Sequence, residues 1–570
     1  MNIDQKIQAI QALMKKKNID TYYVSTRDDH NSEFIHPYFR CIEYLTGFTG
    51  SNAHLIITDK ECRFYTDGRY TIQAKKELKD TCIQIIEDEN FLQYLKTRKH
   101  IGLDGKKVTK SFVDEIGSVT SIDFISEIWN DRPDFPMDPI FILDEKYAGK
   151  SFEEKREEVL KRCKSNIHLL TNLDDIAWLL NCRGYDATSN PVFLSYLLLN
   201  SNQTVLYIKK DKIKDDSYFK NHHIQIKDYL EIYKDIKQIQ EPVTVDENQV
   251  NYELISKIKH PVFQTNPSEL IKACKNKIEI ENIRQCQIMD CAALTKFIYW
   301  LKTNVRTKIL AEYDTVNKLH DFRKILPGYI EVNYGSICAY NENGAMMHYQ
   351  PSKDHSSILK PEGSFLVDSG GQYLNGTTDI TRTFSLGKVS DEFKKDFTTV
   401  LKSHIQLSKA KFLYGCSGIQ LDILARQPIW KENIDYQCGT GHGLGFCLNV
   451  HEGPHGIRWY KTDTRKEDTI LEEGMVVTNE PGIYKENQYG IRIENDMVVQ
   501  KGNKNMYGQF MYFETLSYVP IDIDCIDLSL LDKSEIEWLN QYHHKTYQLL
   551  SPYLNKEEKE WLKEYTKKLA

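Results

Sequence analysis

No run of about 18 consecutive apolar residues occurs in this chain of 570 residues, so nothing in the sequence predicts a membrane-spanning helix. A basic excess is missing too, because 74 lysines and arginines face 81 aspartates and glutamates, a net charge of −7. General nucleic-acid binders usually carry such an excess, so this class is disfavoured. Low-complexity tracts are absent, and 41% hydrophobic with 27% charged residues is ordinary for a globular protein, which excludes wholesale disorder.

Disulfide and export signals are also weak. The thirteen cysteines lie between Cys41 and Cys525, their number is odd, and no CxxC pair occurs. At the amino terminus Ile3, Ile7 and Ile10 recur at helical spacing, whereas a signal peptide would have a continuous apolar segment. We therefore expect free thiols in a reducing compartment and a cytoplasmic protein.

The chain is long enough for about three or four domains of roughly 100–200 residues. Its first half holds a faint internal duplication. A helix and a glycine-rich turn precede strands predicted over residues 53–58 and 63–65. A second helix, over residues 175–181, precedes strands predicted over residues 193–199 and 204–208. Helices that alternate with strands in this way predict two similar α/β units.

A third unit begins near residue 266. Helix signals fill residues 268–305, and strands with glycine turns follow, interrupted by a long helix over residues 391–412. This order predicts an α+β domain. The last sixty residues are helical, and their aromatic side chains need cover from the body of the protein or from a partner chain. We predict four parts: residues 1–150, 151–265, 266–510 and 511–570.

The strands of the third unit carry an unusual set of acidic side chains. A carboxylate within an otherwise apolar strand is costly unless it is paired or bound to a metal. Four carboxylates that converge without a cation would repel one another and take up protons, and a pair of divalent cations resolves that conflict. The residues are Asp368 in FLVD, Asp379 in TTDITRT, His442 in GTGHGLG, Glu480 in VVTNE and Glu494 in GIRIEND.

The ligand types bear on the metal. Four carboxylates and one imidazole, without a thiolate, favour Mn²⁺, Co²⁺ or Fe²⁺ over a structural Zn²⁺ site, which would use cysteine and histidine. The imidazole makes Mg²⁺ less suitable. Taken singly, each acid also fits a surface or capping position, and both Asp368-Ser-Gly-Gly and Glu480-Pro-Gly fit simple turns.

Local geometry adds a condition. Asn375-Gly376 is a strong signal for a two-residue hairpin turn, which would place Gln372 rather than Asp368 opposite Asp379. If both aspartates reach one metal, residues 369–371 must bulge or bend.

The strings LVDSGGQYLNGTTDITRTF, GTGHGLG followed by LNVHEGP, VVTNEPGIY and GIRIEND resemble the successive motifs of aminopeptidase P (X-Pro aminopeptidase). That family belongs to the pita-bread metallopeptidases, together with methionine aminopeptidase, prolidase and creatinase. The resemblance covers the whole chain and is closest to the long, three-domain cytosolic type. It implies an α/β and α+β multidomain fold: two creatinase-like α/β amino-terminal domains, a pita-bread α+β catalytic domain, and a helical carboxy-terminal extension that docks or dimerises.

The resemblance also implies a role for each metal ligand. Asp368 resembles the terminal ligand of one metal, and Asp379 and Glu494 resemble the two bridging carboxylates. His442 and Glu480 resemble the remaining ligands of the other metal. The expected cofactors are two divalent ions, Mn²⁺ first, with Co²⁺, Fe²⁺ or Zn²⁺ as alternatives.

Three further positions, His348, His451 and Arg492, resemble second-line catalytic residues of the family. One position departs from the family pattern: Cys438 stands where a histidine is common, four residues before the ligand histidine. This change removes an imidazole from the pocket wall and leaves the five ligands untouched.

The implied activity is removal of one amino-terminal residue from peptides whose second residue is proline. Two cations would activate a shared water, and Glu480 would accept its proton as general base. His451 would stabilise the tetrahedral oxygen, and His348 would orient the substrate. We expect peptide substrates, no nucleic-acid or membrane partner, and a homodimer.

Two alternatives stay open. Prolidase, an X-Pro dipeptidase, is disfavoured by the length of this chain and by its carboxy-terminal extension. A catalytically inactive pita-bread module that serves as a binding protein is disfavoured because such modules typically lose metal ligands, whereas all five are present here.

Overall fold

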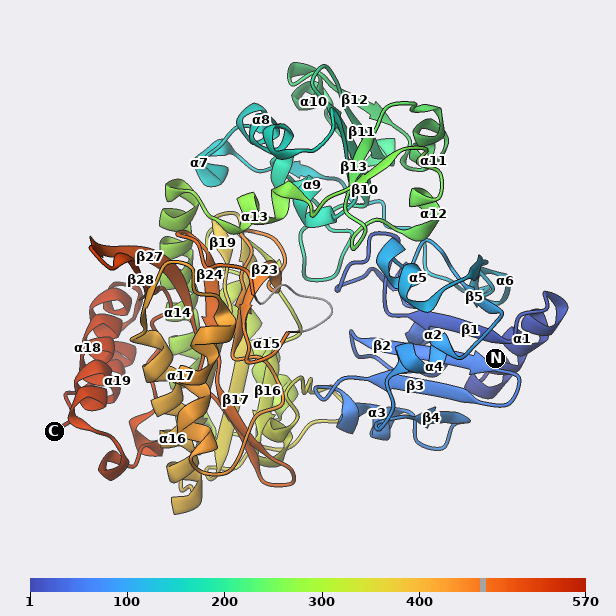
Figure 1. Ribbon diagram of the computed structural model, residues 1–570. Helices are drawn as coiled ribbons and strands as arrows, with labels where there is room; N and C mark the ends of the chain where they lie inside the picture. The colour runs from blue at the N-terminus through green and yellow to red at the C-terminus, as the bar shows by residue number, and fades with distance from the viewer. Residues whose placement is uncertain (462–467) are drawn as a thin grey trace. The chain divides into compact units, whose positions relative to one another are not determined.

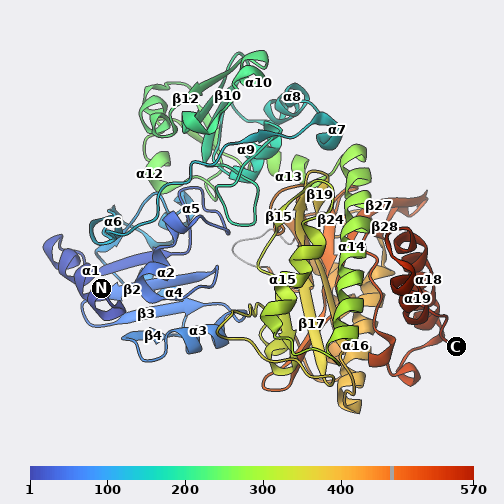
Figure 2. The same cartoon turned by 180° about the vertical axis from the view of Figure 1, so that it is seen from behind.

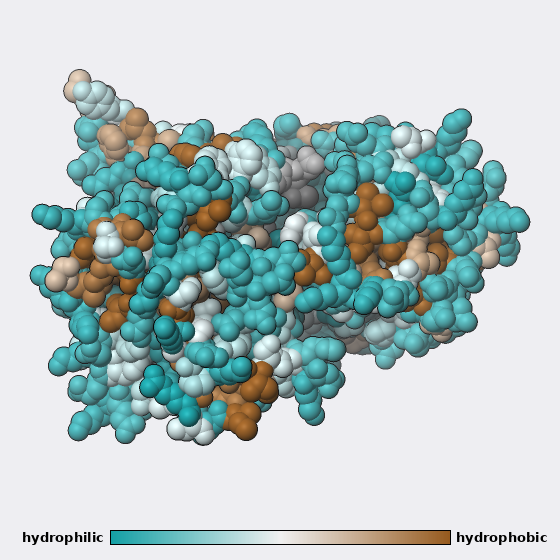
Figure 3. Space-filling view, turned by 90° about the horizontal axis from the view of Figure 1, so that it is seen from below, coloured by the Kyte–Doolittle hydropathy of each residue, from teal (hydrophilic) through white to brown (hydrophobic). Residues whose placement is uncertain are grey.

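The computed structural model describes residues 1–461 and 468–570, which form two compact units (Figure 1). The first unit comprises Met1–Glu145 and Lys150–Glu269, and the second comprises Lys146–Gly149 and Leu270–Ala570. Within the described ranges, no helix combines the length and the apolar character needed to cross a membrane. On the face seen in Figure 3, hydrophobic residues form separate groups among hydrophilic ones.

The first unit contains two six-stranded sheets, with the strand orders β4-β3-β2-β1-β5-β6 and β12-β11-β10-β8-β13-β14. The first sheet consists of β1 (Thr21–Ser25), β2 (Ala53–Thr58), β3 (Cys62–Thr66), β4 (Ile83–Ile85), β5 (Ile101–Leu103) and β6 (Val119–Ser121). The second consists of β8 (Ile167–Leu170), β10 (Ser195–Asn200), β11 (Thr204–Ile208), β12 (Ile224–Lys227), β13 (Val243–Val245) and β14 (Pro261–Phe263).

The two sheets share one topology. Strand β1 pairs antiparallel with β2 and parallel with β5, and β8 pairs in the same way with β10 and β13. The outer pairs β3–β4 and β11–β12 are both parallel. A helix precedes the central hairpin each time, α2 (Cys41–Thr46) in the first sheet and α9 (Leu173–Leu179) in the second. The predicted duplication of two α/β units is therefore confirmed, although α9 ends two residues earlier than predicted.

The predicted helix over residues 268–305 is divided into α13 (Pro267–Ala273) and α14 (Lys277–Asn304). The side chain of Asn276 accepts hydrogen bonds from the main chain of Ile278 and Glu279, and the Glu279 carboxylate accepts one from Asn276 in return. This capping box satisfies the main-chain N–H groups at a helix start, so a new helix begins there.

In the second unit, α14 and α15 (Glu312–Arg323) lie on one side of the sheets (Figures 1 and 2). Buried side chains of α14, among them Leu294 and Phe297, pack with Phe365 and Val367 of β17 and with Phe384 of β20. These strands form a three-stranded sheet in the order β16-β17-β20, with β16 (Ile337–Tyr340), β17 (Ser364–Ser369) and β20 (Ile380–Ser385).

Two other helices, α16 (Asp391–Ser408) and α17 (Gly418–Trp430), pack on the remaining strands of this unit. Helix α16 ends four residues before the predicted end, because the chain turns into a short strand, β21. The six-stranded sheet here runs in the order β21-β28-β27-β24-β22-β23. Its strands are β21 (Lys411–Leu413), β22 (Gly441–Gly443), β23 (Glu452–Ile457), β24 (Val476–Asn479), β27 (Asn495–Asn505) and β28 (Gly508–Thr515).

The carboxy-terminal helices α18 (Lys533–Leu550) and α19 (Lys556–Tyr565) pack within the second unit. Leu550 and Leu562 are fully buried in one hydrophobic cluster with Phe297 of α14. The Tyr542 hydroxyl accepts a hydrogen bond from Arg382 Nη2 at 2.7 Å. The aromatic tail is thus covered by the body of its own chain.

Candidate metal centre

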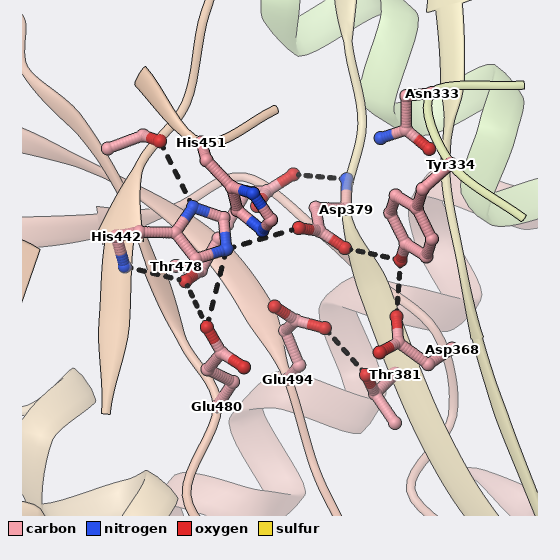
Figure 4. A network of polar contacts seen from close by, with 12 residues as sticks. Asn333, Tyr334, Asp368, Asp379, Thr381, His442, His451, Thr478, Glu480 and Glu494 are labelled. Atoms are coloured by element: carbon pink, nitrogen blue, oxygen red, sulfur yellow. Dashed lines mark hydrogen bonds and ion pairs between the residues drawn. The ribbon is translucent and has the colours of Figure 1, made fainter. Parts of the chain in front are cut away.

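Five strand ends of the second unit bring the predicted ligands together (Figure 4). Between Glu480 and Glu494 the chain forms a two-stranded hairpin of β25 (Gly482–Lys485) and β26 (Tyr489–Arg492). Asp368 lies near the end of β17, Asp379 directly before β20, His442 in β22, Glu480 directly after β24, and Glu494 between β26 and β27.

Three of the five form the centre of the group. Asp379, His442 and Glu494 each offer a ligand atom, and these atoms lie within 4.8 Å of one another. His442 Nε2 lies 3.4 Å from Asp379 Oδ2 and 3.3 Å from Glu480 Oε1. One imidazole nitrogen therefore faces two carboxylates.

Asp368 is linked to this centre through Tyr334. The Tyr334 hydroxyl hydrogen-bonds to Asp368 Oδ1 and lies 2.6 Å from Asp379 Oδ1. On its other side Asp368 forms an ion pair with the guanidinium of Arg492, whose Nη1 donates to the Tyr484 hydroxyl at 2.7 Å. All five predicted ligands thus belong to one connected group.

The two aspartates meet in a way that the sequence did not predict. Gln372 pairs with Thr377, so the two-residue turn is Leu374-Asn375, and the predicted turn at Asn375-Gly376 is wrong by one residue. Asp368 pairs with Thr381 rather than with Asp379. Since alternate residues of a strand share a face, Asp379 lies on the same face as Thr381 and diagonally opposite Asp368.

No extra residue bulges out of this hairpin; instead the ladder is interrupted at Gly370. The sheet of β17 and β20 ends at Ser369, and β18 (Gly371–Tyr373) and β19 (Gly376–Thr377) belong to another sheet. A Cβ at Gly370 would lie 1.8 Å from the carbonyl oxygen of Thr378, so the close approach requires glycine.

Burial and mutual repulsion govern the charges of the group. Burial first, and then the neighbouring Asp368, raise the pKa of Asp379 from 3.8 to about 7. The pKa of Glu494 lies well above its ordinary range, because the residue is buried beside Asp379 and Glu480. Burial also raises the pKa of Glu480, although His442 opposes that shift.

This donor set fits divalent cations. Carboxylates that hold protons because no positive charge lies near them lose those protons when a cation binds. Oxygen and imidazole donors without a thiolate suit Mn²⁺, Fe²⁺ or Co²⁺. Buried carboxylates on facing strands can also bridge two ions.

Two of the predicted second-line residues, His451 and Arg492, contact the group, and the segment of the third, His348, packs against its strands. The ring of His451 stands perpendicular to that of His442, with centroids 4.5 Å apart. Arg492 contacts Asp368 directly. His348 is half-buried in the turn after the short helix η5 (Asn341–Ala345), which packs against β17 and β26. The segment that carries His348 therefore lies beside the strands of Asp368 and Arg492.

Cys438 lies half-buried in the loop before β22. Its carbonyl oxygen accepts a hydrogen bond from Arg426 Nη2 at 2.7 Å. Burial, with Glu480 nearby, raises the pKa of the Cys438 thiol to about 12, so the group is neutral at physiological pH. A neutral thiol thus stands where a histidine is common in the family, and it adds no charge beside Glu480.

Four supporting residues were not singled out from the sequence. Tyr334 bridges two aspartates, Thr381 Oγ1 donates to Glu494 Oε2 at 2.6 Å, and Thr478 Oγ1 donates to Glu480 Oε1 at 3.1 Å. Asp496 Oδ2 accepts the main-chain N–H of Asp379 at 3.1 Å. Alternate residues of a strand share a face, so Thr381 shares the face of Asp379 and Asp496 that of Glu494, and both could have been marked from the sequence. No pattern marks Tyr334, which comes from a loop.

Four family models together match nearly the whole chain. The description "Metallopeptidase family M24" matches residues 281–501, and "C-terminal region of peptidase_M24" matches residues 509–569. Two models described as "Creatinase/Prolidase N-terminal domain" match residues 6–130 and 131–279.

Named proteins are similar over nearly the full chain. A probable Xaa-Pro aminopeptidase P of Laccaria bicolor is 33% identical, covering 97% of this chain and 91% of the relative. Xaa-Pro aminopeptidase 1 of Dictyostelium discoideum is also 33% identical, covering 97% and 94%. The crystal structure of X-prolyl aminopeptidase from Caenorhabditis elegans, described as a cytosolic enzyme with a di-nuclear active site, superposes with a TM-score of 0.94 at 31% identity, covering 100% of both chains.

These similarities confirm the predicted fold class, two creatinase-like amino-terminal domains followed by a pita-bread domain. They also confirm the predicted resemblance and, with it, a hydrolytic enzyme. The chain therefore belongs to metallopeptidase family M24, alongside the Xaa-Pro aminopeptidases.

Proposed function

We propose that this chain is a metal-dependent Xaa-Pro aminopeptidase that releases the first residue of peptides with proline in second place. The observation that carries the proposal is the convergence of Asp379, His442 and Glu494, with Asp368 and Glu480 in contact with them, in a chain that matches named Xaa-Pro aminopeptidases over its length.

Five side chains would hold two divalent ions, and we propose Mn²⁺ as the preferred metal: Asp368, Asp379, His442, Glu480 and Glu494. When bound, such ions supply a nucleophile at neutral pH and polarise the substrate carbonyl. Arg492 and Tyr334 hold the Asp368 carboxylate from two sides, which fixes its orientation before any metal arrives.

Glu480 is the proposed general base. Its Oε1 accepts a hydrogen bond from Thr478, which fixes the orientation of the carboxylate, and burial raises its pKa, which favours acceptance of a proton. His451, beside His442, is proposed to donate a hydrogen bond to the oxygen that becomes negative during attack. His348 is proposed to orient the substrate.

We also propose the division of the chain into residues 1–150, 151–265, 266–510 and 511–570, and a cytoplasmic location. The thirteen cysteines are all free thiols, which is consistent with a reducing compartment. A homodimer stays a proposal as well. The tail aromatics give it no support, because Trp538 and Trp561 pack against the hydrophobic clusters of their own unit.

The test compares the protein as purified, after chelation, and after resupply of Mn²⁺, with Arg-Pro-Pro and the dipeptide Arg-Pro as substrates. We expect Arg release from Arg-Pro-Pro, loss of turnover on chelation, and recovery with Mn²⁺. Glu480→Gln should lower kcat by about 10²–10⁴-fold. Glu486→Gln, at an exposed position six residues on, is the control and should leave kcat unchanged.

Two outcomes would contradict the proposal. Full activity in an ion-free preparation would exclude the metal centre. Preferred cleavage of the dipeptide would make the chain a prolidase.

A further inference from the structure

We propose that Glu312 is a positioning residue: its buried carboxylate anchors residues 341–357, the segment that carries His348, against the strand face of the metal centre. The inference rests on the proposed function, because it assigns Glu312 an effect through His348. Neither the sequence motifs nor the metal ligands include Glu312.

The Glu312 carboxylate is fully buried and satisfied by four donors. Glu312 Oε1 accepts from the main-chain N–H of Tyr340 at 2.7 Å and from Asn343 Nδ2 at 2.9 Å. Glu312 Oε2 accepts from the Tyr349 hydroxyl at 2.7 Å and from the main-chain N–H of Ser357 at 2.7 Å. Tyr340 immediately precedes the segment, and the other three donors come from its start, its middle and its end.

The contact with Tyr349 acts next to His348 in the chain. The Tyr349 ring packs on Ile337, Ala339 and Leu366, the inner residues of strands β16 and β17. Leu366 lies two residues before Asp368, and therefore on the same face of β17. Anchoring Tyr349 thus fixes the main chain of His348 over the face that presents Asp368.

The two ends of the segment are held as well. Ser364 N donates to Asn341 Oδ1 at 2.9 Å, which joins the first end to β17. At the other end, Glu312 N donates to the Ser357 carbonyl at 3.1 Å, and Tyr313 N donates to Ser356 Oγ at 2.8 Å. The first turn of α15 therefore closes the segment into a loop around a single carboxylate.

Four donors need a side chain that accepts at both of its terminal oxygens, as this carboxylate does. A glutamine at this position would turn its NH₂ group toward the main-chain N–H of either Tyr340 or Ser357, so at least one buried N–H would lose its acceptor. Glu312→Gln is thus a small change in shape that releases the anchor. Tyr349→Phe removes one of the four donors and leaves the carboxylate in place. It replaces Glu312→Gln in the tests below if Glu312→Gln does not fold.

The first test is a double-mutant cycle with Arg-Pro-Pro. We expect Glu312→Gln to lower kcat/KM by about 10–100-fold, as loss of a supporting hydrogen-bond partner does elsewhere. Combined with His348→Ala, it should lower kcat/KM no further than His348→Ala alone. If the fold-losses in kcat/KM of the two single variants multiply in the double variant, the two residues act independently and the proposal is overturned. The control Asp522→Asn removes a buried carboxylate that accepts from Ser385 N at 2.8 Å, and should lower thermal stability without changing kcat/KM.

The second test does not depend on activity. Lys353 is exposed within the segment, and the next lysine, Lys360, precedes a proline, so trypsin has one defined site here. Release of the anchor should speed cleavage after Lys353 in Glu312→Gln, but not in Asp522→Asn, while Mn²⁺ binding measured by calorimetry stays unchanged. Equal cleavage rates would overturn the inference. A wild-type protein inactive on Arg-Pro-Pro would instead overturn the proposed function and leave this readout intact.

Discussion

At the scale of single residues, the candidate metal centre is marked by an electrostatically unfavourable arrangement of carboxylates. Asp379 and Glu494 are buried, lie beside further carboxylates, and face a single imidazole. Burial penalises the ionised form of each carboxylate, and each ionised neighbour penalises it again, so the metal-free group holds protons that a solvated carboxylate would lose. The same repulsion provides the affinity for cations.

The pH dependence of this group follows from the direction of the shift. The unfolded chain releases the Asp379 proton near pH 3.8, whereas the folded, metal-free chain keeps it up to about pH 7. The folded state therefore binds more protons across this window, and the contribution of this group to the free energy of unfolding falls as pH rises from about 4 to 7. Below about pH 4, Asp379 is protonated in both the folded and the unfolded chain, and its contribution to the free energy of unfolding is fully present.

We expect metal binding to displace this proton. Calorimetric titration with Mn²⁺ in buffers of different ionisation enthalpy should record more protons released per ion at pH 6 than at pH 8, with tighter binding at pH 8. Equal proton release at the two pH values would contradict the shifted pKa of Asp379.

Tyr334 joins the two aspartates of the group, Asp368 and Asp379. Because its hydroxyl contacts both carboxylates, we expect Tyr334→Phe to weaken Mn²⁺ binding by about 10–100-fold with little loss of thermal stability. Equilibrium dialysis against Mn²⁺ measures the affinity. Tyr329→Phe, which removes a hydroxyl 3.3 Å from His320 Nδ1, is the matched control and should leave Mn²⁺ affinity unchanged. Unchanged affinity in Tyr334→Phe would show that the hydroxyl is dispensable.

At the scale of elements, the interrupted hairpin decides where the two aspartates lie. The strand β17 stops at Ser369, and its continuation belongs to a second sheet with β15 (Tyr329–Val332). This change of sheet at Gly370 leaves Asp379 outside the regular ladder, where its side chain reaches His442. The hairpin was predicted from the sequence, but its turn lies one residue earlier than Asn375-Gly376 suggested.

Gly370→Ala tests this hairpin. The added Cβ would lie 1.8 Å from the Thr378 carbonyl, next to Asp379, so the main chain must shift. We expect a loss of about 1–3 kcal/mol in the free energy of unfolding, together with weaker Mn²⁺ binding. Gly502→Ala is the control, because its Cβ would meet nothing nearer than 3.4 Å. Denaturant unfolding measures both variants, and equal stabilities would contradict the close approach at Gly370.

At the scale of the whole molecule, the carboxy-terminal helices α18 and α19 contribute buried side chains to the hydrophobic clusters of the second unit. Leu539 and Leu562 are fully buried, and the hydroxyl of Tyr542 binds Arg382 between β20 and α18. The sequence required cover for these side chains but left open whether the same chain or a partner supplied it. The structure supplies it from α14, α16 and the neighbouring strands of the same chain.

Deletion of residues 533–570 tests this packing. We expect the truncated chain to expose the apolar side of α14 and to aggregate or melt well below the full chain, because a buried cluster is opened to water. Differential scanning fluorimetry and size-exclusion chromatography measure the outcome. A truncated protein with the thermal stability of the full chain would contradict the assignment of this tail to the core.

The sequence by itself determined which chemistry is available. Period-two alternation around Asp379 and Glu494, the clustering of carboxylates with one imidazole, and the repeated helix-and-hairpin order are local properties, so the five candidate ligands and the duplicated sheets could be predicted from them. The family motifs added the expected role of each candidate ligand, the second-line residues and the expected activity.

Only the tertiary structure decided how these parts meet. The bridging hydroxyl of Tyr334, the change of sheet at Gly370 and the anchor at Glu312 join residues that lie tens of positions apart, and none of them follows a local pattern. Hydrogen bonds over such separations depend on the path of the main chain, which propensity and periodicity do not specify. The residue types fix what the metal centre can bind, and the packing of distant strands fixes where each ligand stands.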